Sequence, residues 1–149
     1  MSEIKVQKLH INLMLPNAVL ASVEADELQI PGALGNLAIR PNHAPLITEI
    51  GIGELKIKGS SEEKKNDFFV AGGFFKVKEN QVDVFLDVAE PFHKINLERA
   101  KSAKERAERR LAGNKSSSLE NSSESVDITR AQIALSRALF RIKIAESRR

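Results

Sequence analysis

Two segments near the end of the 149-residue chain carry arginines at helical spacing. An ideal helix rotates by about 100° per residue, and this rotation brings the arginines of each segment onto one line. They are Arg99, Arg106 and Arg110 in residues 95–111, and Arg130, Arg137, Arg141 and Arg148 in residues 128–149. Guanidinium groups stay charged and pair with phosphate or carboxylate. Each line is therefore suited to binding a polyanion.

A seam of small and apolar residues runs beside each line of arginines. The seams are Ala100, Ala103, Ala107 and Leu111, and Ile128, Ala131, Leu135, Ala138, Leu139 and Ile142. Both lines are rotated from their seams by roughly 70 to 80° in the same sense. Two antiparallel helices that pack by these seams would therefore place both lines on one side. We call this set the basic flank: Arg99, Arg106, Arg110, Arg130, Arg137 and Arg141.

The stability of such a hairpin does not explain the basic flank. Like charges a few ångströms apart in water repel by about 1 kcal/mol per pair before screening. An alanine seam buries little surface, at about 0.8 kcal/mol per CH₂. We expect a conditional hairpin, closed when an anion bridges the arginines and open when another surface competes for them. The alternative is that the arginines form an ordinary solvated helix face.

Charge is distributed unevenly along the chain. Residues 95–149 contain thirteen Lys and Arg against seven Asp and Glu, a charge of +6, whereas residues 1–94 carry −3. The C-terminal part should therefore meet an anionic ligand or an acidic protein surface. A basic helical module that binds nucleic acid is the alternative, although Phe140 is the one aromatic side chain available for stacking on either helix.

Composition excludes several kinds of site. The chain has no cysteine, which rules out disulfides, thiolate metal sites and a cysteine nucleophile. No apolar run approaches the roughly 18 residues of a membrane span, and the first residues do not resemble a signal peptide. We expect a soluble protein.

No catalytic constellation is recognisable. His10, His43 and His93 are far apart in the sequence, without metal-ligand spacing or a neighbouring acidic residue, so we expect structural or surface roles for them. A nucleophile elbow and a phosphate-binding glycine loop are both missing. The chain should not be an enzyme by itself, which argues against a free-standing nucleotide-binding enzyme.

Residues 4–94 read as many short strands separated by Gly, Pro and Asn, and Val82, Val84, Leu86 and Val88 alternate with outward residues. The predicted fold class is α+β, with an antiparallel β-sandwich or flattened barrel before a two-helix antiparallel hairpin. The expected domains are residues 1–90 and 91–149. Helices are expected at about 95–112 and 127–148, joined by a mobile Ser-rich connection over 113–126. Asp127 or Thr129 could cap the second helix.

The segment Arg40–Leu46 contains two prolines, which fix φ and remove two backbone donors. It should be a rigid loop at a sheet edge. Two roles remain open for it, namely docking to another protein and a tight crossover that holds the sandwich together.

Several segments together resemble a known family. Gly35–Leu46 is similar to the pattern Gly-x-Leu-x-Ile-x-Pro-x-His-x-Pro-Leu, Phe69–Val77 to the next pattern, and Gln81–Val84 follows. With the C-terminal hairpin, they resemble the epsilon subunit of the bacterial or chloroplast rotary (F-type) ATP synthase, called delta in mitochondria. The resemblance covers nearly the full length.

The resemblance implies a non-catalytic rotor subunit of the proton-translocating enzyme. Its sandwich would bind the gamma subunit and the ring of c subunits, with a docking loop that faces the c ring: Pro41, Asn42, His43, Ala44, Pro45 and Leu46. The helices would fold on the sandwich, or extend and inhibit ATP hydrolysis by contacting acidic loops of the catalytic alpha and beta subunits. We expect these contacts from Arg130, Arg137 and Arg141. No nucleic acid is expected as a partner.

The resemblance also implies a regulatory nucleotide. Some relatives bind ATP in the folded hairpin through a motif like Ile/Leu-Asp-x-x-Arg-Ala, which corresponds to Ile95–Ala100. The matching positions are Glu90, Ile95, Asn96, Arg99, Ala100, Arg106, Arg137 and Arg141. Asn96 stands where the motif has Asp, so a charged acceptor is missing. No cofactor is required, and ATP is the expected regulatory ligand. The expected location is the cytoplasmic face of a bacterial inner membrane, through the complex alone, in preference to a chloroplast thylakoid.

Overall fold

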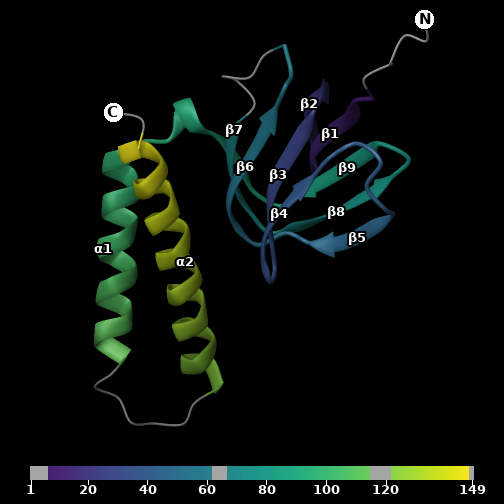
Figure 1. The fold of residues 1–149 in the computed structure, drawn as a ribbon. Coiled ribbons are helices and arrows are strands. Elements are labelled where there is room, and N and C mark those ends of the chain that lie inside the picture. Colours follow the sequence, from purple (N-terminus) through teal and green to yellow (C-terminus); the bar gives the residue numbers. More distant parts are fainter. Residues whose placement is uncertain (1–6, 62–66, 115–121, 148–149) are drawn as a thin grey trace, which may run out of the picture. The chain divides into compact units, whose positions relative to one another are not determined.

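The computed structural model describes residues 7–61, 67–114 and 122–147. The chain divides into two compact units, Met1–Phe92 and His93–Arg149 (Figure 1). The division lies two residues after the boundary that the sequence suggested. Strands occupy the first unit and both long helices the second, so the expected α+β class is confirmed.

The first unit is a sandwich of two five-stranded sheets. The first sheet has the order β2-β1-β9-β8-β5, with β1 (Leu9–Leu15), β2 (Ala18–Ala25), β5 (Leu46–Glu49), β8 (Gly73–Lys78) and β9 (Gln81–Leu86). The second has the order β10-β7-β6-β3-β4, with β3 (Glu27–Gly32), β4 (Gly35–Ile39), β6 (Ile52–Lys58), β7 (Asp67–Ala71) and β10 (Ala89–Pro91). Neighbouring strands are antiparallel except β1 and β9, which are parallel.

The core lies between the two sheets and is supplied by alternate residues of each strand. In β9, Val82, Val84 and Leu86 are buried, whereas Asp83 and Phe85 lie on the other face. The strand predicted from this alternation is confirmed, although it ends before Val88. The largest fully buried core side chains include Ile11, Leu28, Leu55 and Phe75.

Glycines mark two of the points where the chain crosses between the sheets. Gly51 lies between β5 and β6, and Gly72 lies between β7 and β8. The Gly72 N–H donates to the Gly51 carbonyl at 3.2 Å, which joins the two crossings. Gly72 has a φ of 84°, a conformation in which glycine is least strained.

The loop that contains two prolines also crosses between sheets, from β4 to β5. Its Asn42 N–H donates to Oδ1 of Asn80, in the β8–β9 turn, at 2.6 Å. The His43 N–H donates to the Arg40 carbonyl at 3.2 Å. The crossover interpretation of this loop is therefore confirmed, and docking through it stays a prediction.

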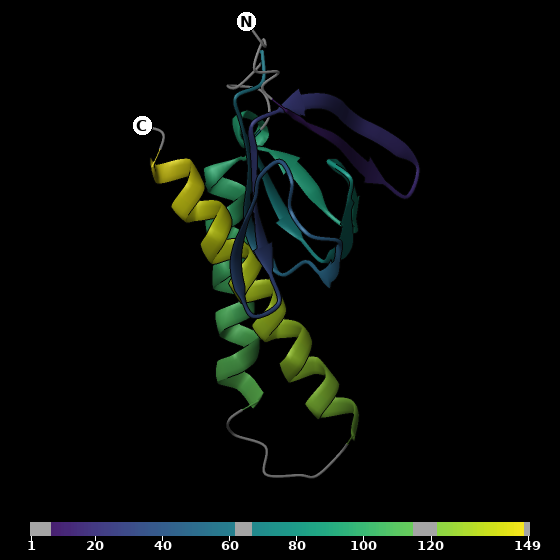
Figure 2. The ribbon, with the colours of Figure 1, turned by 45° about the vertical axis from the view of Figure 1, so that its right-hand side comes forward.

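In the second unit, α1 (Leu97–Asn114) and α2 (Ser122–Ser147) pack side by side and antiparallel (Figures 1 and 2). A short 3₁₀ turn, η2 (Phe92–Lys94), precedes them. Among the described helices, none combines the length and the apolar composition needed to cross a lipid bilayer.

The start of the second helix was predicted wrongly. It begins at Ser122 rather than 127, so residues 122–126 are helical and do not belong to the expected connection. Asp127 and Thr129 lie inside the helix and cannot cap it. Residues 122–126 contain no Gly or Pro, and Ser and Glu cost a helix only about 0.5 kcal/mol each or less. Residues 113 and 114 of the expected connection are also helical, at the end of α1. The rest of the connection, residues 115–121, lies outside the described residues, as does Arg148.

Candidate functional site

Small side chains line the contact between the two helices. Ala100 and Ala107 on α1 are each 3% exposed, and Ala131 and Ala138 on α2 are 1% and 0% exposed. The larger seam residues Ile128, Leu135 and Ile142 are half-buried. Alanines let two helix backbones approach closely, so the predicted seams do form the contact.

One seam residue was misplaced by sequence reasoning. Leu139 is 45% exposed, and its neighbour Ala138 is the residue buried in the seam. Adjacent residues of a helix point in directions about 100° apart, so both cannot face the seam. A second apolar line on α2 was missed, formed by Ile133, Phe140 and the fully buried Ile144. Its spacing of seven and four residues was visible in the sequence. The helix is therefore apolar on two sides.

The basic flank is largely accessible. Arg99, Arg106, Arg110 and Arg130 are exposed, whereas Arg137 and Arg141 are half-buried. The flank arginines differ from the other charges of the hairpin in their ion pairing, and this difference makes the flank a candidate site.

Other charges of α1 form ion pairs along the helix. Lys104 pairs with Glu108 at 3.9 Å, and Arg109 pairs with Glu105 at 3.5 Å. Within the described residues, by contrast, no ion pair involves the flank members Arg99, Arg106, Arg110, Arg130 and Arg137. These guanidinium groups are available to an external anion.

Arg137 carries a further unsatisfied group. Its Nε is buried and has no hydrogen-bond partner in the described part of the chain. A buried donor without a partner costs about 1 to 3 kcal/mol. A ligand acceptor that reached this nitrogen would remove that cost.

Asn96 also has a structural role that its place in the nucleotide-binding motif did not reveal. Its Oδ1 accepts a hydrogen bond from the Arg99 N–H at 3.1 Å, and its backbone carbonyl accepts from the Ala100 N–H at 3.1 Å. Asn96 is therefore the N-cap of α1. Asn directly before an apolar helical pattern is a recognisable N-cap signal, so this role could have been predicted.

The other predicted nucleotide-site residues are not all brought together. Arg99, Arg106, Arg137 and Arg141 belong to the packed helices, and the half-buried Ile95 precedes α1. Ala100 is buried in the seam and so does not face the flank. Glu90 lies in β10 of the other unit, opposite Phe69 of β7.

A hydrogen-bonded carboxylate lies where β3 begins and β4 ends. Arg40 Nε donates to Glu27 Oε2 at 2.8 Å, and the Gln29 amide donates to Glu27 Oε1 at 2.8 Å. These hydrogen bonds, that of Arg40 first, hold the pKa of Glu27 below its usual value. They fasten the start of the two-proline loop.

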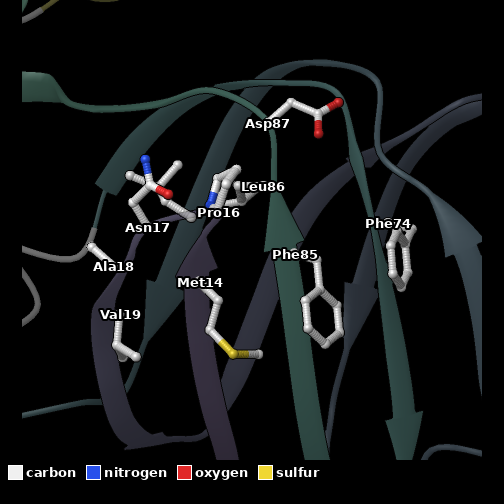
Figure 3. Close-up of a pocket in the computed structure, with 10 residues that line it drawn as sticks. Met14, Pro16, Asn17, Ala18, Val19, Phe74, Phe85, Leu86 and Asp87 are labelled. Atoms are coloured by element: carbon white, nitrogen blue, oxygen red, sulfur yellow. The ribbon is translucent and has the colours of Figure 1, made fainter.

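The sandwich has an apolar groove of about 680 Å³ on the outer face of its first sheet (Figure 3). Its centre is a row in register across four strands, where Val19 opposes Met14, Met14 opposes Phe85, and Phe85 opposes Phe74. The two phenyl rings stack at 4.8 Å between centroids. Val19 is 67% and Phe74 49% exposed, so the row is a candidate protein-contact surface.

The next row of the same face is polar. Ser22 Oγ donates to Asn12 Oδ1 at 2.7 Å, and Asn12 Nδ2 donates to Asp83 Oδ1 at 3.1 Å. Asp83 also pairs with Lys76 at 3.7 Å. These contacts connect four strands and hold the sheet beside the groove in a fixed shape.

One expectation about the histidines is wrong. His10 Nδ1 lies 3.3 Å from Glu24 Oε1, so His10 does have an acidic neighbour across β1 and β2. The pair is remote in sequence and became visible only with the strand register. The groups involved are exposed, which fits the expected surface role of His10.

Comparison with known proteins gives consistent results for both units. The family model described as ATP synthase, Delta/Epsilon chain, beta-sandwich domain matches residues 8–92. The model described as ATP synthase, Delta/Epsilon chain, long alpha-helix domain matches residues 93–146.

Curated relatives match over almost their whole length. The ATP synthase epsilon chain of Desulforamulus reducens is 41% identical over 142 residues, covering 95% of this chain and 98% of the relative. That of Desulfitobacterium hafniense strain Y51 is 37% identical over 137 residues, covering 92% and 96%.

Solved structures share the fold. A chain in the mitochondrial ATP synthase of Euglena gracilis superimposes with a TM-score of 0.74 at 18% identity, over 99% of this chain and 86% of that one. A chain of the Tetrahymena thermophila mitochondrial ATP synthase, in a structure of its central stalk and c-ring, gives 0.64 at 20% identity, over 93% and 97%.

Proposed function

Because the chain belongs to the delta/epsilon family of ATP synthase subunits, we propose that it is a rotor subunit that couples gamma to the c ring and restrains ATP hydrolysis. It is a subunit of ATP synthase and not an enzyme by itself. The family assignment replaces the nucleic-acid-binding alternative. The protein belongs to the periphery of the membrane complex, and we place it on the cytoplasmic face of a bacterial inner membrane.

Inhibition of ATP hydrolysis, which we call the brake, is the first part of the proposal. The observation that carries it is that Arg130 and Arg137 form no ion pair among the described residues, whereas other charges of the hairpin are paired. When the hairpin opens, Arg130, Arg137 and Arg141 contact acidic loops of the catalytic alpha and beta subunits. Charge-assisted hydrogen bonds of this kind favour Arg over other residues.

The test replaces Arg130, Arg137 and Arg141 together by Ala in the assembled enzyme. We expect ATP hydrolysis to rise, with ATP synthesis retained. The matched control is Lys143→Ala, which removes an exposed positive charge from the same helix at a position roughly 140° away from the flank. Unchanged hydrolysis in the triple variant, or an equal rise in the control, would exclude the proposed brake.

The second part concerns the rotor contacts. We assign gamma to the apolar groove, because its stacked aromatic row is exposed and its polar neighbours hold the sheet in shape. Buried aromatic anchors dominate many protein interfaces. The two-proline loop, Pro41–Leu46, is the proposed contact of the c ring.

Binding of isolated gamma tests the groove. Phe74→Ser should weaken this binding by about tenfold or more, equivalent to about 1.4 kcal/mol. Leu34→Ser is the control, since Leu34 is fully exposed and does not line the groove. Both variants should keep the fold, because both side chains are accessible. Equal gamma affinity of the two variants would disprove the assignment.

The third part is regulation by ATP. We propose that ATP bridges the arginines of the closed hairpin and so holds it away from the catalytic subunits. The unpartnered Nε of Arg137 and the flank arginines without ion pairs support an acceptor-rich ligand. Saturable binding of ATP to the isolated protein, lost in Arg99→Ala and Arg137→Ala variants, is the expected result.

A further inference from the structure

Asn96 lies beside the start of the basic flank, between the directions of Arg99 and the seam residue Ala100. At about 100° per residue, Asn96 lies roughly 60° around α1 from Arg99 and one turn closer to the start of the helix. Its side chain is exposed. A ligand with phosphates along Arg99 and Arg106 could therefore meet Asn96 at its other end.

The N-cap fixes which end of the Asn96 amide faces outward. The Arg99 N–H is a donor, so the atom 3.1 Å from it must be the amide oxygen. This oxygen is directed toward the first turn of α1. The Nδ2 group lies on the opposite side of the amide and has no partner in the described part of the chain. The outward end of Asn96 therefore presents two N–H donors.

Hydrogen-bond donors at Asn96 give adenine no advantage over guanine. The exocyclic amine of adenine is itself a donor and needs an acceptor, whereas guanine has a carbonyl oxygen in the equivalent place. The guanidinium groups of the flank are also donors only. A phosphate chain supplies the acceptors that these groups need. The adenine amine does not, and the Asn96 donors can reach a ring nitrogen of either base or the guanine carbonyl oxygen, so they do not single out adenine.

We infer that the flank selects its ligand by the polyphosphate chain and does not discriminate in favour of adenine. This inference rests on the nucleotide regulation proposed above. The ligand class is any triphosphate, whether it carries adenine, guanine or no base. The hairpin would then respond to the total pool of such anions.

Isothermal titration of the full-length protein with ATP, GTP and inorganic tripolyphosphate, with and without Mg²⁺, tests the inference. We expect affinities for ATP and GTP within about threefold, and saturable binding of tripolyphosphate. Competition among the three should show one shared site.

The variant Asn96→Asp provides the matched comparison. Asp is also a good N-cap, so α1 keeps its start, while the second carboxylate oxygen faces outward as a charged acceptor. The ratio of ATP affinity to GTP affinity should rise by about tenfold or more, because hydrogen bonds to charged groups are strong. Tripolyphosphate should bind more weakly through charge repulsion.

The outcomes separate the inference from the proposal on which it rests. ATP bound more than tenfold tighter than GTP by the unchanged protein would overturn the inference and leave nucleotide regulation standing. An ATP-to-GTP ratio unaffected by Asn96→Asp would overturn the role of Asn96. Failure of all three anions to bind would overturn both.

Discussion

Replacing Ala138 by Leu should open the helical hairpin without unfolding the sandwich. Ala138 is fully buried in the seam between α1 and α2. A leucine there adds three carbon atoms where the helices are closest, and overpacking of this kind costs about 1 to 3 kcal/mol. The sandwich belongs to the other compact unit and keeps its own core.

The magnitude follows from the seam itself. Four buried alanine methyl groups at about 0.8 kcal/mol each contribute only about 3 kcal/mol to closing. A penalty of about 1 to 3 kcal/mol changes the ratio of open to closed hairpins by roughly 5- to 150-fold. The penalty is therefore comparable with the contribution of the four buried methyl groups, to which the half-buried seam residues Ile128, Leu135 and Ile142 add.

Distance measurements between spin labels would detect the opening. The chain has no cysteine, so two introduced cysteines at the exposed positions Glu108 and Gln132 can carry the labels. Ala138→Leu should lengthen and broaden the distance distribution. In the assembled enzyme, the opened helix should also inhibit ATP hydrolysis more strongly.

The matched control is Ala134→Leu, one turn earlier on the same helix. Ala134 is exposed, and Ala and Leu have similar helix propensities, so this change should leave the distances unaltered. If both variants gave the distribution of the unchanged protein, the seam would not be what closes the hairpin. The reasoning would also fail if Ala134→Leu opened the helices equally.

Two further predictions concern the sandwich. Gly73→Ala should destabilise it by about 2 to 5 kcal/mol in urea unfolding, because Gly73 has a φ of 126° and an added methyl group would collide with the Phe85 carbonyl. Gly113→Ala is the control, because a methyl group added there meets no atom within 4 Å, and it should not destabilise the protein. Equal destabilisation by the two variants would contradict the steric argument. Glu27→Gln should lower stability at pH 7 by less than about 1 kcal/mol. The folded-state pKa of Glu27 is depressed below 4.5, so the stability difference between the two proteins should disappear as pH falls below about 4.5 and through that pKa. A stability difference that did not change with pH would refute the role of the Glu27 charge.

Local patterns in the sequence predicted the elements well where one face of each element is buried. Alternation in Val82–Leu86 identified β9, and alanine spacing identified the seams. Strand pairing could not be predicted in the same way. The parallel contact of β1 with β9 joins residues about 70 positions apart, and no local pattern encodes such a register.

The groove and the cap of α1 illustrate two further limits. Val19 and Met14 lie in the β1–β2 hairpin, and Phe85 and Phe74 lie in the β8–β9 hairpin. These two parts of the chain are far apart in sequence, so their common row appears only when the strand order is known. Asn96 was interpreted through its place in a motif, and its capping role was overlooked. A residue at the start of a helix can accept a hydrogen bond from a backbone N–H and also face a ligand. The backbone hydrogen bond then decides which side-chain atom can contact the ligand.

The seam favours the closed hairpin and the basic flank favours the open one, so a bound ligand can shift the equilibrium between the two states. The four seam methyl groups contribute about 3 kcal/mol, and the clustered positive charges oppose closing. An anion at one hundred times its dissociation constant adds about 2.7 kcal/mol to the state that binds it. Because the ligand contribution is as large as that of the four methyl groups, occupancy of the flank shifts the hairpin toward the closed state. A seam with more fully buried large side chains, and with paired arginines beside it, would favour the closed hairpin more strongly and reduce this sensitivity.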